Sequence, residues 1–142
     1  MLHEFIRNQR IARLATVDKK GHPYVVPICY VFDGEFIFFV LDQKPKTLKL
    51  LELKRVRNIV TNPQVSLVID KYYEDWQKLG FVTILGKANL LQTGKEHVRV
   101  ILMLKEKYIQ YKSMRIDHNP IIKITITKMI AWGDLQSADT NN

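Results

Sequence analysis

The order of strand-like and helix-like patterns is the feature of this sequence that most constrains its fold. Six short runs rich in β-branched and aromatic residues are bounded by turn residues, and only two helical patterns interrupt them. The runs are "IARLATVD", "PYVVPICYVF", "EFIFFVL", "QVSLVID", "FVTILGKANLL" and "IIKITITKMIAWG". Because strands and helices do not alternate, a doubly wound parallel sheet is disfavoured. We predict a mainly β fold, a six-stranded antiparallel barrel, since closure removes the edges of an open sheet.

Turn residues and one proline refine the first half of this prediction. The turn "KKGH" follows the first run, and "DG" at Asp33 and Gly34 is a strong hairpin signal between the second and third runs. The chain therefore begins as an antiparallel meander. Pro27 lies inside the second run, where it removes a backbone donor. We expect that strand to have an edge position, a bulge or a backbone stretch facing a ligand.

Two helical patterns interrupt the strands, and the first ten residues read as a further short helix or arm. From Thr47 to Val60 the alternation is lost, and apolar and basic residues fall on opposite sides of a helical wheel. The apolar side holds Leu48, Val56 and Ile59, and the basic side holds Lys46, Lys54 and Arg57. The dipeptide "NP" at Asn62 and Pro63 should end this helix. A second helix, "KEHVRVILMLKEKYIQY", follows Gly94.

Length and composition indicate one globular domain. The 142 residues, 46% apolar and 25% charged, suit a single domain over residues 1–136 with a disordered tail at 137–142. No apolar run approaches the roughly 18 residues of a membrane-spanning helix, and the first ten residues mix in charge where a signal peptide is apolar. We therefore expect a cytoplasmic protein with no membrane partner.

Cysteine and histidine give no sign of a metal site. The single cysteine, Cys29, cannot form an intramolecular disulfide and lies in an apolar run, where a small buried hydrophobe fits. The four histidines are scattered, and none has ligand spacing to another histidine or to Cys29. We predict no metal.

The net charge of +8 is largely local. Between Lys44 and Arg57 the chain carries six basic residues and one acid, Glu52. Basic residues are unfavourable at a helix start unless an anion lies there, so a phosphate is one explanation. A solvated basic face is a second, and single-stranded nucleic acid is a third, although no recognised nucleic-acid motif is present.

The stretch "YYEDW", residues 72–76, is unusual for a connection between strands. A hairpin needs only residues that tolerate positive φ, whereas this one combines three aromatic residues with two acids. The aromatic residues could plug one end of the barrel, with Glu74 and Asp75 solvated or paired to Lys71 and Lys78. No G-x-S-x-G or other nucleophile arrangement is visible, so any reaction would rely on a cofactor.

Three segments together resemble a known family. They are "ARLATVDKKGHPYVVPICYVFDG", "DQKPKTLKLLELKRVRNIVTNPQVSLVID" and "YYEDWQKLGFVTILGKA". The chain from about Arg10 to Gly133 resembles the flavin- and deazaflavin-binding split barrels related to pyridoxamine 5'-phosphate oxidase, and especially the probable coenzyme F-420-dependent enzymes. The pattern D-x-Y-x-E-D-W at Asp70–Trp76 is the narrowest of these signals. The family commonly has histidine where this chain has Lys71.

The resemblance implies a six-stranded split barrel that forms a homodimer and holds each cofactor in a groove between subunits. Basic residues would bind the cofactor phosphate, strand backbone would line its rings, and the end of the third strand would flank its ribityl chain. Two tryptophans would approach from elsewhere, including the partner subunit. The residues implied for the phosphate are Lys44, Lys46, Arg55 and Arg57, and those for the rings are Val26, Pro27, Ile28 and Cys29. The residues implied for the ribityl chain are Val40, Leu41 and Asp42. The two tryptophans are Trp76 and Trp132.

The implied activity is that of an oxidoreductase transferring hydride between coenzyme F-420, or FMN, and a small organic substrate. The resemblance identifies no catalytic residue. A non-catalytic protein that binds FMN or F-420 is the alternative, followed by a basic RNA-binding module, although no nucleic-acid partner is expected. Pyridoxamine phosphate oxidation itself is disfavoured, because "AWGDLQSADTNN" does not match the substrate-binding C-terminal segment of those oxidases.

Overall fold

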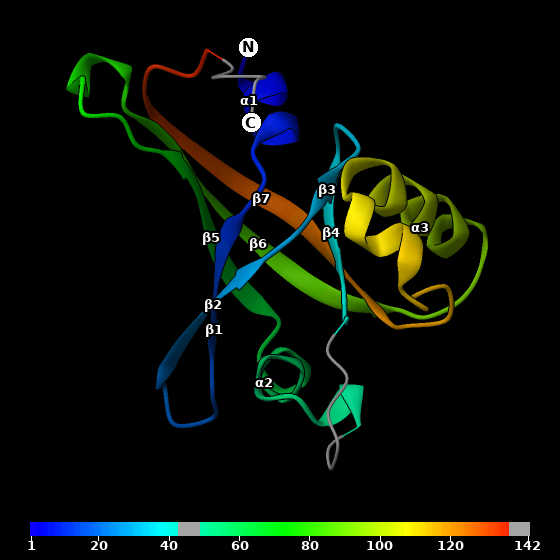
Figure 1. Ribbon diagram of the computed structural model, residues 1–142. Coiled ribbons are helices and arrows are strands. Elements are labelled where there is room, and N and C mark those ends of the chain that lie inside the picture. Colours follow the sequence, from blue (N-terminus) through cyan, green and yellow to red (C-terminus); the bar gives the residue numbers. More distant parts are fainter. Residues whose placement is uncertain (43–48, 137–142) are drawn as a thin grey trace.

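The computed structural model of the protein describes residues 1–42 and 49–136 (Figure 1). The described chain forms one antiparallel sheet with three α-helices around it. The strands are β1 (Ala12–Val17), β2 (Pro23–Ile28), β3 (Val31–Phe32), β4 (Phe36–Val40), β5 (Gln64–Lys71), β6 (Gly80–Leu91) and β7 (Ile121–Gly133). The helices are α1 (Leu2–Asn8), α2 (Lys54–Thr61) and α3 (Lys95–Lys107), with 3-10 turns at Leu50–Glu52, Trp76–Lys78 and Ile109–Ser113.

The sheet is curled into a split barrel. Its strand order is β2-β1-β5-β6-β7-β4-β3, so β2 and β3 lie at opposite edges. Only Cys29 and Tyr30 separate the two strands along the chain. Ile28 and Val31 can therefore be no more than about 11 Å apart, because three extended residue steps span no more. This short link brings the two edges of the sheet together.

The sheet has seven strands in the described residues, so the prediction of six was wrong. The run "PYVVPICYVF" divides into β2 and β3 at Tyr30. The backbone N–H of Tyr30 donates to the Tyr108 hydroxyl at 3.0 Å, and that hydroxyl also lies 3.0 Å from the Tyr30 carbonyl. These contacts with Tyr108 take the place of hydrogen bonds between strands, at the point where the chain passes from edge strand β2 to edge strand β3. The edge position predicted for the strand containing Pro27 is confirmed, because β2 is an edge strand.

Two hydrophobic clusters stabilise the barrel. Alternating residues such as Leu14, Leu67 and Ile84 fill the barrel interior and are at most 2% exposed. A second cluster lies between α3 and strands β3, β4 and β7, and includes Val100 and Phe38. The helix α3 is thereby packed against the outside of the sheet (Figure 1).

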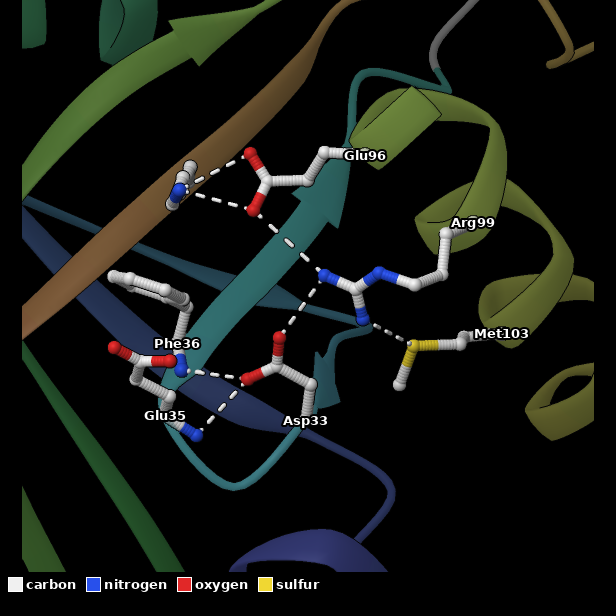
Figure 2. Close-up of polar contacts among 7 residues, drawn as sticks. Asp33, Glu35, Phe36, Glu96, Arg99 and Met103 are labelled. Atoms are coloured by element: carbon white, nitrogen blue, oxygen red, sulfur yellow. Dashed lines mark hydrogen bonds and ion pairs between the residues drawn. The ribbon is translucent and has the colours of Figure 1, made fainter. Parts of the chain in front are cut away.

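A network of charged side chains also connects α3 to the sheet (Figure 2). On α3, Glu96 accepts hydrogen bonds from Lys123 of β7 at 2.9 and 3.0 Å. Arg99 of the same helix donates to Asp33 at 3.1 Å. Asp33 also accepts from the backbone N–H of Phe36, 2.7 Å away, and so fixes the predicted Asp33–Gly34 turn. The network holds the β3–β4 hairpin, α3 and β7 together.

The basic helix is shorter than the predicted span of Thr47–Val60. The helix α2 begins only after Leu53, whose ψ of 144° is extended and interrupts the helix. Residues 47 and 48 lie outside the described chain. Val56 and Ile59 are buried, as the helical wheel predicted. The predicted end before Asn62 and Pro63 is confirmed, since the helix ends at Thr61.

Candidate functional site

A groove of about 380 Å³ lies between the edge strand β2, the end of β4 and the start of α2. Seven of the residues predicted to bind the cofactor line it. They are Val26, Pro27, Ile28, Cys29, Val40, Asp42 and Arg55. Six further residues line the groove and were not predicted as cofactor contacts: Ile11, Tyr24, Phe39, Leu53, Lys54 and Tyr111. Segments that are distant in sequence thus meet in one groove.

Arg55 gives the groove its strongest electrostatic feature. Its side chain lines the groove from the first turn of α2, yet the residue is only 9% exposed. The Nε atom has no hydrogen-bond partner, and no ion pair involves Arg55, within the described part of the chain. Burial lowers the pKa of Arg55, and the nearby Asp42 carboxylate offsets part of that effect. A buried cation without a partner is costly, so an anion bound here would be strongly stabilised.

Asp42 provides an acceptor on the same groove. The hydroxyl of Tyr111 donates to its carboxylate, which joins the 3-10 turn after α3 to the end of β4. Burial, followed by this carboxylate, raises the pKa of Tyr111 and keeps its hydroxyl protonated. A carboxylate held in this way can still accept hydrogen bonds from hydroxyl groups of a ligand.

The edge strand β2 offers backbone groups to the groove. It pairs with β1 alone among the described strands, so the groups on its other side have no strand partner there. Cys29 follows the strand. It is partly exposed, whereas the sequence predicted a buried residue. Burial raises the pKa of its thiol, and Asp42 adds to that effect. The groove therefore presents a neutral thiol beside unpaired backbone.

Four residues that were predicted to bind the cofactor phosphate or ribityl chain are not among the described residues that line the groove. Leu41, the residue after β4, is fully buried in the barrel core, in the same cluster as Ile37 and Phe39. Arg57 lines another cavity beside α2. Lys44 and Lys46 are outside the described residues, so their predicted phosphate contacts stay predictions.

The two tryptophans lie away from the groove within one chain. Trp76 is in the connection between β5 and β6, which projects at the end of the barrel opposite α2 (Figure 1). Trp132 stacks on Phe81 with ring centroids 5.6 Å apart. Their exposed fractions are 70% and 54%, so Trp76 does not plug the barrel, and contact with a cofactor would require another subunit.

The acids of the "YYEDW" loop do not pair with the neighbouring lysines. Asp75 accepts a hydrogen bond from the backbone N–H of Gln77 and begins a 3-10 turn. The amines of Lys71 and Lys78 instead lie 5.6 and 5.9 Å from the centroid of the Tyr73 ring. The loop is therefore an exposed aromatic projection with its own internal contacts.

Two classes of site are not found in the described residues. Over 1–42 and 49–136, no group of three or more histidine, cysteine or acidic side chains is arranged to hold a metal ion. Within the same ranges, each helix is too short or too polar to cross a bilayer.

Known structures share this fold at low sequence identity. Protein Rv2991 from Mycobacterium tuberculosis, described as a conserved hypothetical protein, superposes with a TM-score of 0.74 at 20% identity, over 92% of this chain and 81% of the other. HutZ, a heme storage protein from Vibrio cholerae, gives 0.70 at 18% identity, over 89% of both chains. An F420 reductase gives 0.66 at 18% identity, over 90% of this chain and 94% of the other. No curated protein matches the sequence.

The match to a protein family is more specific than these superpositions. It spans residues 1–133 and so includes β2, β4 and α2, the three elements that form the groove. The described fold, a split barrel of seven antiparallel strands, agrees with this match. The chain therefore belongs to the pyridoxamine 5'-phosphate oxidase family.

Proposed function

We propose that this protein is an oxidoreductase that binds coenzyme F-420 or FMN in the groove and transfers hydride between that cofactor and a small organic substrate. The observation that carries the proposal is the buried Arg55, without a described partner, facing the same groove as the unpaired edge of β2. A ligand in which a short chain joins an anionic group to a flat ring system would contact both Arg55 and the edge of β2. Family membership and the F420 reductase of similar fold support this choice.

Each side of the groove would have a separate binding role. Arg55 and Lys54 would hold the phosphate, since charge-assisted contacts to phosphate are among the strongest hydrogen bonds. Asp42, held by Tyr111, would accept hydrogen bonds from the ribityl hydroxyls. The backbone from Val26 to Cys29 would line the rings. When bound, the cofactor supplies a hydride-transferring centre, the central ring carbon of the deazaflavin or N5 of FMN.

The protein would contribute orientation and exclusion of water, not an acid or base of its own. Cys29 has a raised pKa, and Tyr111 is held by Asp42, so neither is suited to rapid proton transfer at neutral pH. Holding the cofactor against a strand edge fixes one ring face and leaves the other for substrate. Turnover would therefore depend on how the groove positions the two reactants.

The groove favours a flavin-type cofactor over heme, although HutZ is described as a heme storage protein. No histidine is among its described lining residues, and its one sulfur donor is Cys29. A thiolate is the form that binds metal, whereas burial raises the pKa of this thiol. The buried arginine is better suited to a phosphate.

We expect the apo-protein to bind coenzyme F-420 more tightly than FMN. The deazaflavin carries a polyglutamate tail, so it has more negative charge to place near a basic surface, and attraction should weaken as salt screens it. Titration of both compounds by tryptophan fluorescence, at low and raised ionic strength, measures the preference. If FMN binds at least tenfold more tightly under both conditions, the deazaflavin assignment is wrong. Binding without hydride transfer to any added acceptor would identify a non-catalytic binding protein.

We also propose that two copies of the chain pair through the outer face of the sheet. On this face Val68, Thr83 and Ile130 are in register across β5, β6 and β7, and Phe81 lies opposite Trp132. Ile130 is 45% exposed, and Val25 on β2 is 61% exposed. Exposed apolar side chains on a sheet face are stabilised when another surface covers them. Pairing would also give Trp76 and Trp132 access to a partner's groove.

Light scattering should give about twice the 16.7 kDa mass of one chain at micromolar concentration. Ile130→Asp introduces a charge into the proposed interface and should weaken pairing at least tenfold, because an unpaired buried charge is costly. Ile109→Asp is the control, since Ile109 is 80% exposed on the 3-10 turn after α3. A monomeric wild-type protein, or an Ile130→Asp variant that still dimerises fully, would contradict this interface.

A further inference from the structure

The structure contains a second and larger cavity on the other side of α2. It has a volume of about 610 Å³ and lies between the β1–β2 turn and the helix. These two elements lie near one another at the lower end of the molecule in Figure 1. Lys54 is the one residue that lines both this cavity and the cofactor groove among the described residues.

The walls of this cavity are strongly basic. Lys19 and Lys20 come from the turn, Lys54 and Arg57 come from α2, and His22 lies beside them. No ion pair within the described chain involves either turn lysine or Arg57. Two elements thus present cations without a described ion pair to one open cavity.

The single acid on these walls has other partners. Asp18 accepts hydrogen bonds from the backbone N–H groups of Lys20 and His22 at 2.8 and 2.9 Å. Its second oxygen lies 3.1 Å from the His22 ring. The backbone N–H of His22 contributes most to lowering the pKa of Asp18, so this carboxylate stays ionised to close the turn. It does not form an ion pair with either lysine.

The neutral polar residues of the cavity are also satisfied. The Asn58 amide donates to the Thr16 hydroxyl at 3.0 Å, and the Thr61 hydroxyl donates to the Arg57 carbonyl at 3.1 Å. The cationic side chains are therefore the groups that a ligand could engage. Leu51 and Val60 add an apolar rim that is 42% and 67% exposed.

The positive charges of α2 destabilise the helix. No acidic residue occurs in α2, and its first turn contains cations, which the helix dipole disfavours. Lys54 and Arg57 are three residues apart, so their like charges repel each other on the helix surface. A bound anion would remove both penalties. A helix N-terminus alone would not make a site, but here the β1–β2 turn adds two further cations opposite it.

We propose that this cavity is a second anion site, which binds a small ligand carrying at least two phosphate groups. One phosphate would contact Arg57 from α2, and the other would contact Lys19 and Lys20 from the turn. Such a ligand would bridge two elements that no described charge pair now connects. The site is separate from the cofactor groove, because Arg55 lines the groove and not this cavity.

Calorimetric titration with inorganic pyrophosphate, in phosphate-free buffer at low salt, tests this proposal. Pyrophosphate could also bind at Arg55, so the titration is repeated in the Arg55→Met variant, which leaves the second cavity unchanged. We expect one site per chain to persist there. Arg57→Gln or Lys20→Gln added to that variant should each weaken binding about tenfold, since each removes a charge-assisted contact. Lys112→Gln, an exposed lysine outside both cavities, is the matched control.

The outcomes separate this site from the proposed cofactor site. Loss of pyrophosphate binding in Arg55→Met would overturn the second site and leave the cofactor proposal intact. Binding that is equal in the Arg57→Gln, Lys20→Gln and control proteins would also overturn it. Persistent binding that is sensitive to Arg57 and Lys20 would support it, whether or not FMN or F-420 binds in the groove.

Discussion

Replacing Arg55 by methionine should weaken cofactor binding by about 10- to 150-fold, because a charge-assisted contact to phosphate contributes roughly 1.5–3 kcal/mol. The same change should leave the apo-protein at least as stable. Arg55 is buried, and its Nε has no partner in the described residues, so removing its charge removes a desolvation cost. A methionine of similar length retains most of the apolar part of the side chain. Lower affinity together with undiminished stability is typical of a residue kept for binding.

Two measurements on the same protein samples test this expectation. Fluorescence titration with FMN and F-420 gives the loss of affinity, and urea unfolding without cofactor gives the change in stability. Arg115→Met is the matched control, because Arg115 is an exposed arginine with no described contact. If Arg55→Met unfolds more easily and binds cofactor as before, Arg55 is a structural residue. The anion would then have to bind elsewhere, and the cofactor assignment of the groove would be wrong.

Local sequence patterns predicted most of the strands and the burial within them. Alternation in "QVSLVID" buries Val65, Leu67 and Ile69, and the proline inside the second run predicted the edge position of β2. These features depend on side chains within a few residues of one another. The division of the second run did not follow from such patterns, because it depends on contacts between Tyr30 and Tyr108, which are 78 residues apart.

In the groove, too, the sequence predicted some residues and missed those whose roles depend on contacts distant in sequence. Arg55 and the backbone of β2 were selected through family resemblance, and the helical wheel placed Arg57 on the basic side of α2. Tyr111 was missed because its role depends on reaching Asp42, 69 residues earlier. Lys54 was noted only as part of a basic face, whereas the structure places it between two cavities. Its proximity to the Tyr24 ring, 5.7 Å away, could not be read from spacing.

Lys107 lies at the end of α3 and should make the stability of the protein depend on pH. Its Nζ atom is buried and has no hydrogen-bond partner among the described residues. It lies 4.0 Å from the centroid of the Tyr30 ring. Burial, and then the charge of Arg10, lower the pKa of Lys107 to about 7, while Cys29 opposes this. An unfolded lysine keeps its ordinary pKa near 10.4, so unfolding takes up a proton between these values.

The sign of the pH dependence follows from this proton uptake. Because the unfolded chain binds more protons, stability should rise as pH increases from about 7 to 10. Above pH 10 the trend reverses, since burial raises the pKa of Tyr108 to about 12 and the fold therefore favours its neutral form. The window for Lys107 is therefore pH 7–10.

Lys107→Met should stabilise the protein by about 2–4 kcal/mol at pH 7, because the pKa difference corresponds to 1.36 kcal/mol per unit and the Tyr30 ring returns part of it. The gain should shrink towards zero as the pH rises to 10 and above, because the folded amine is then neutral and the unfolded amine, with a pKa near 10.4, also begins to lose its proton. Urea unfolding at pH 7, 8, 9 and 10, at one protein concentration, measures both effects, with the exposed Lys112→Met as control. If Lys107→Met is less stable at every pH, the tyrosine rings stabilise a charged amine more than burial destabilises it. Lys107 would then hold the junction of β2, β3 and α3 as a cation.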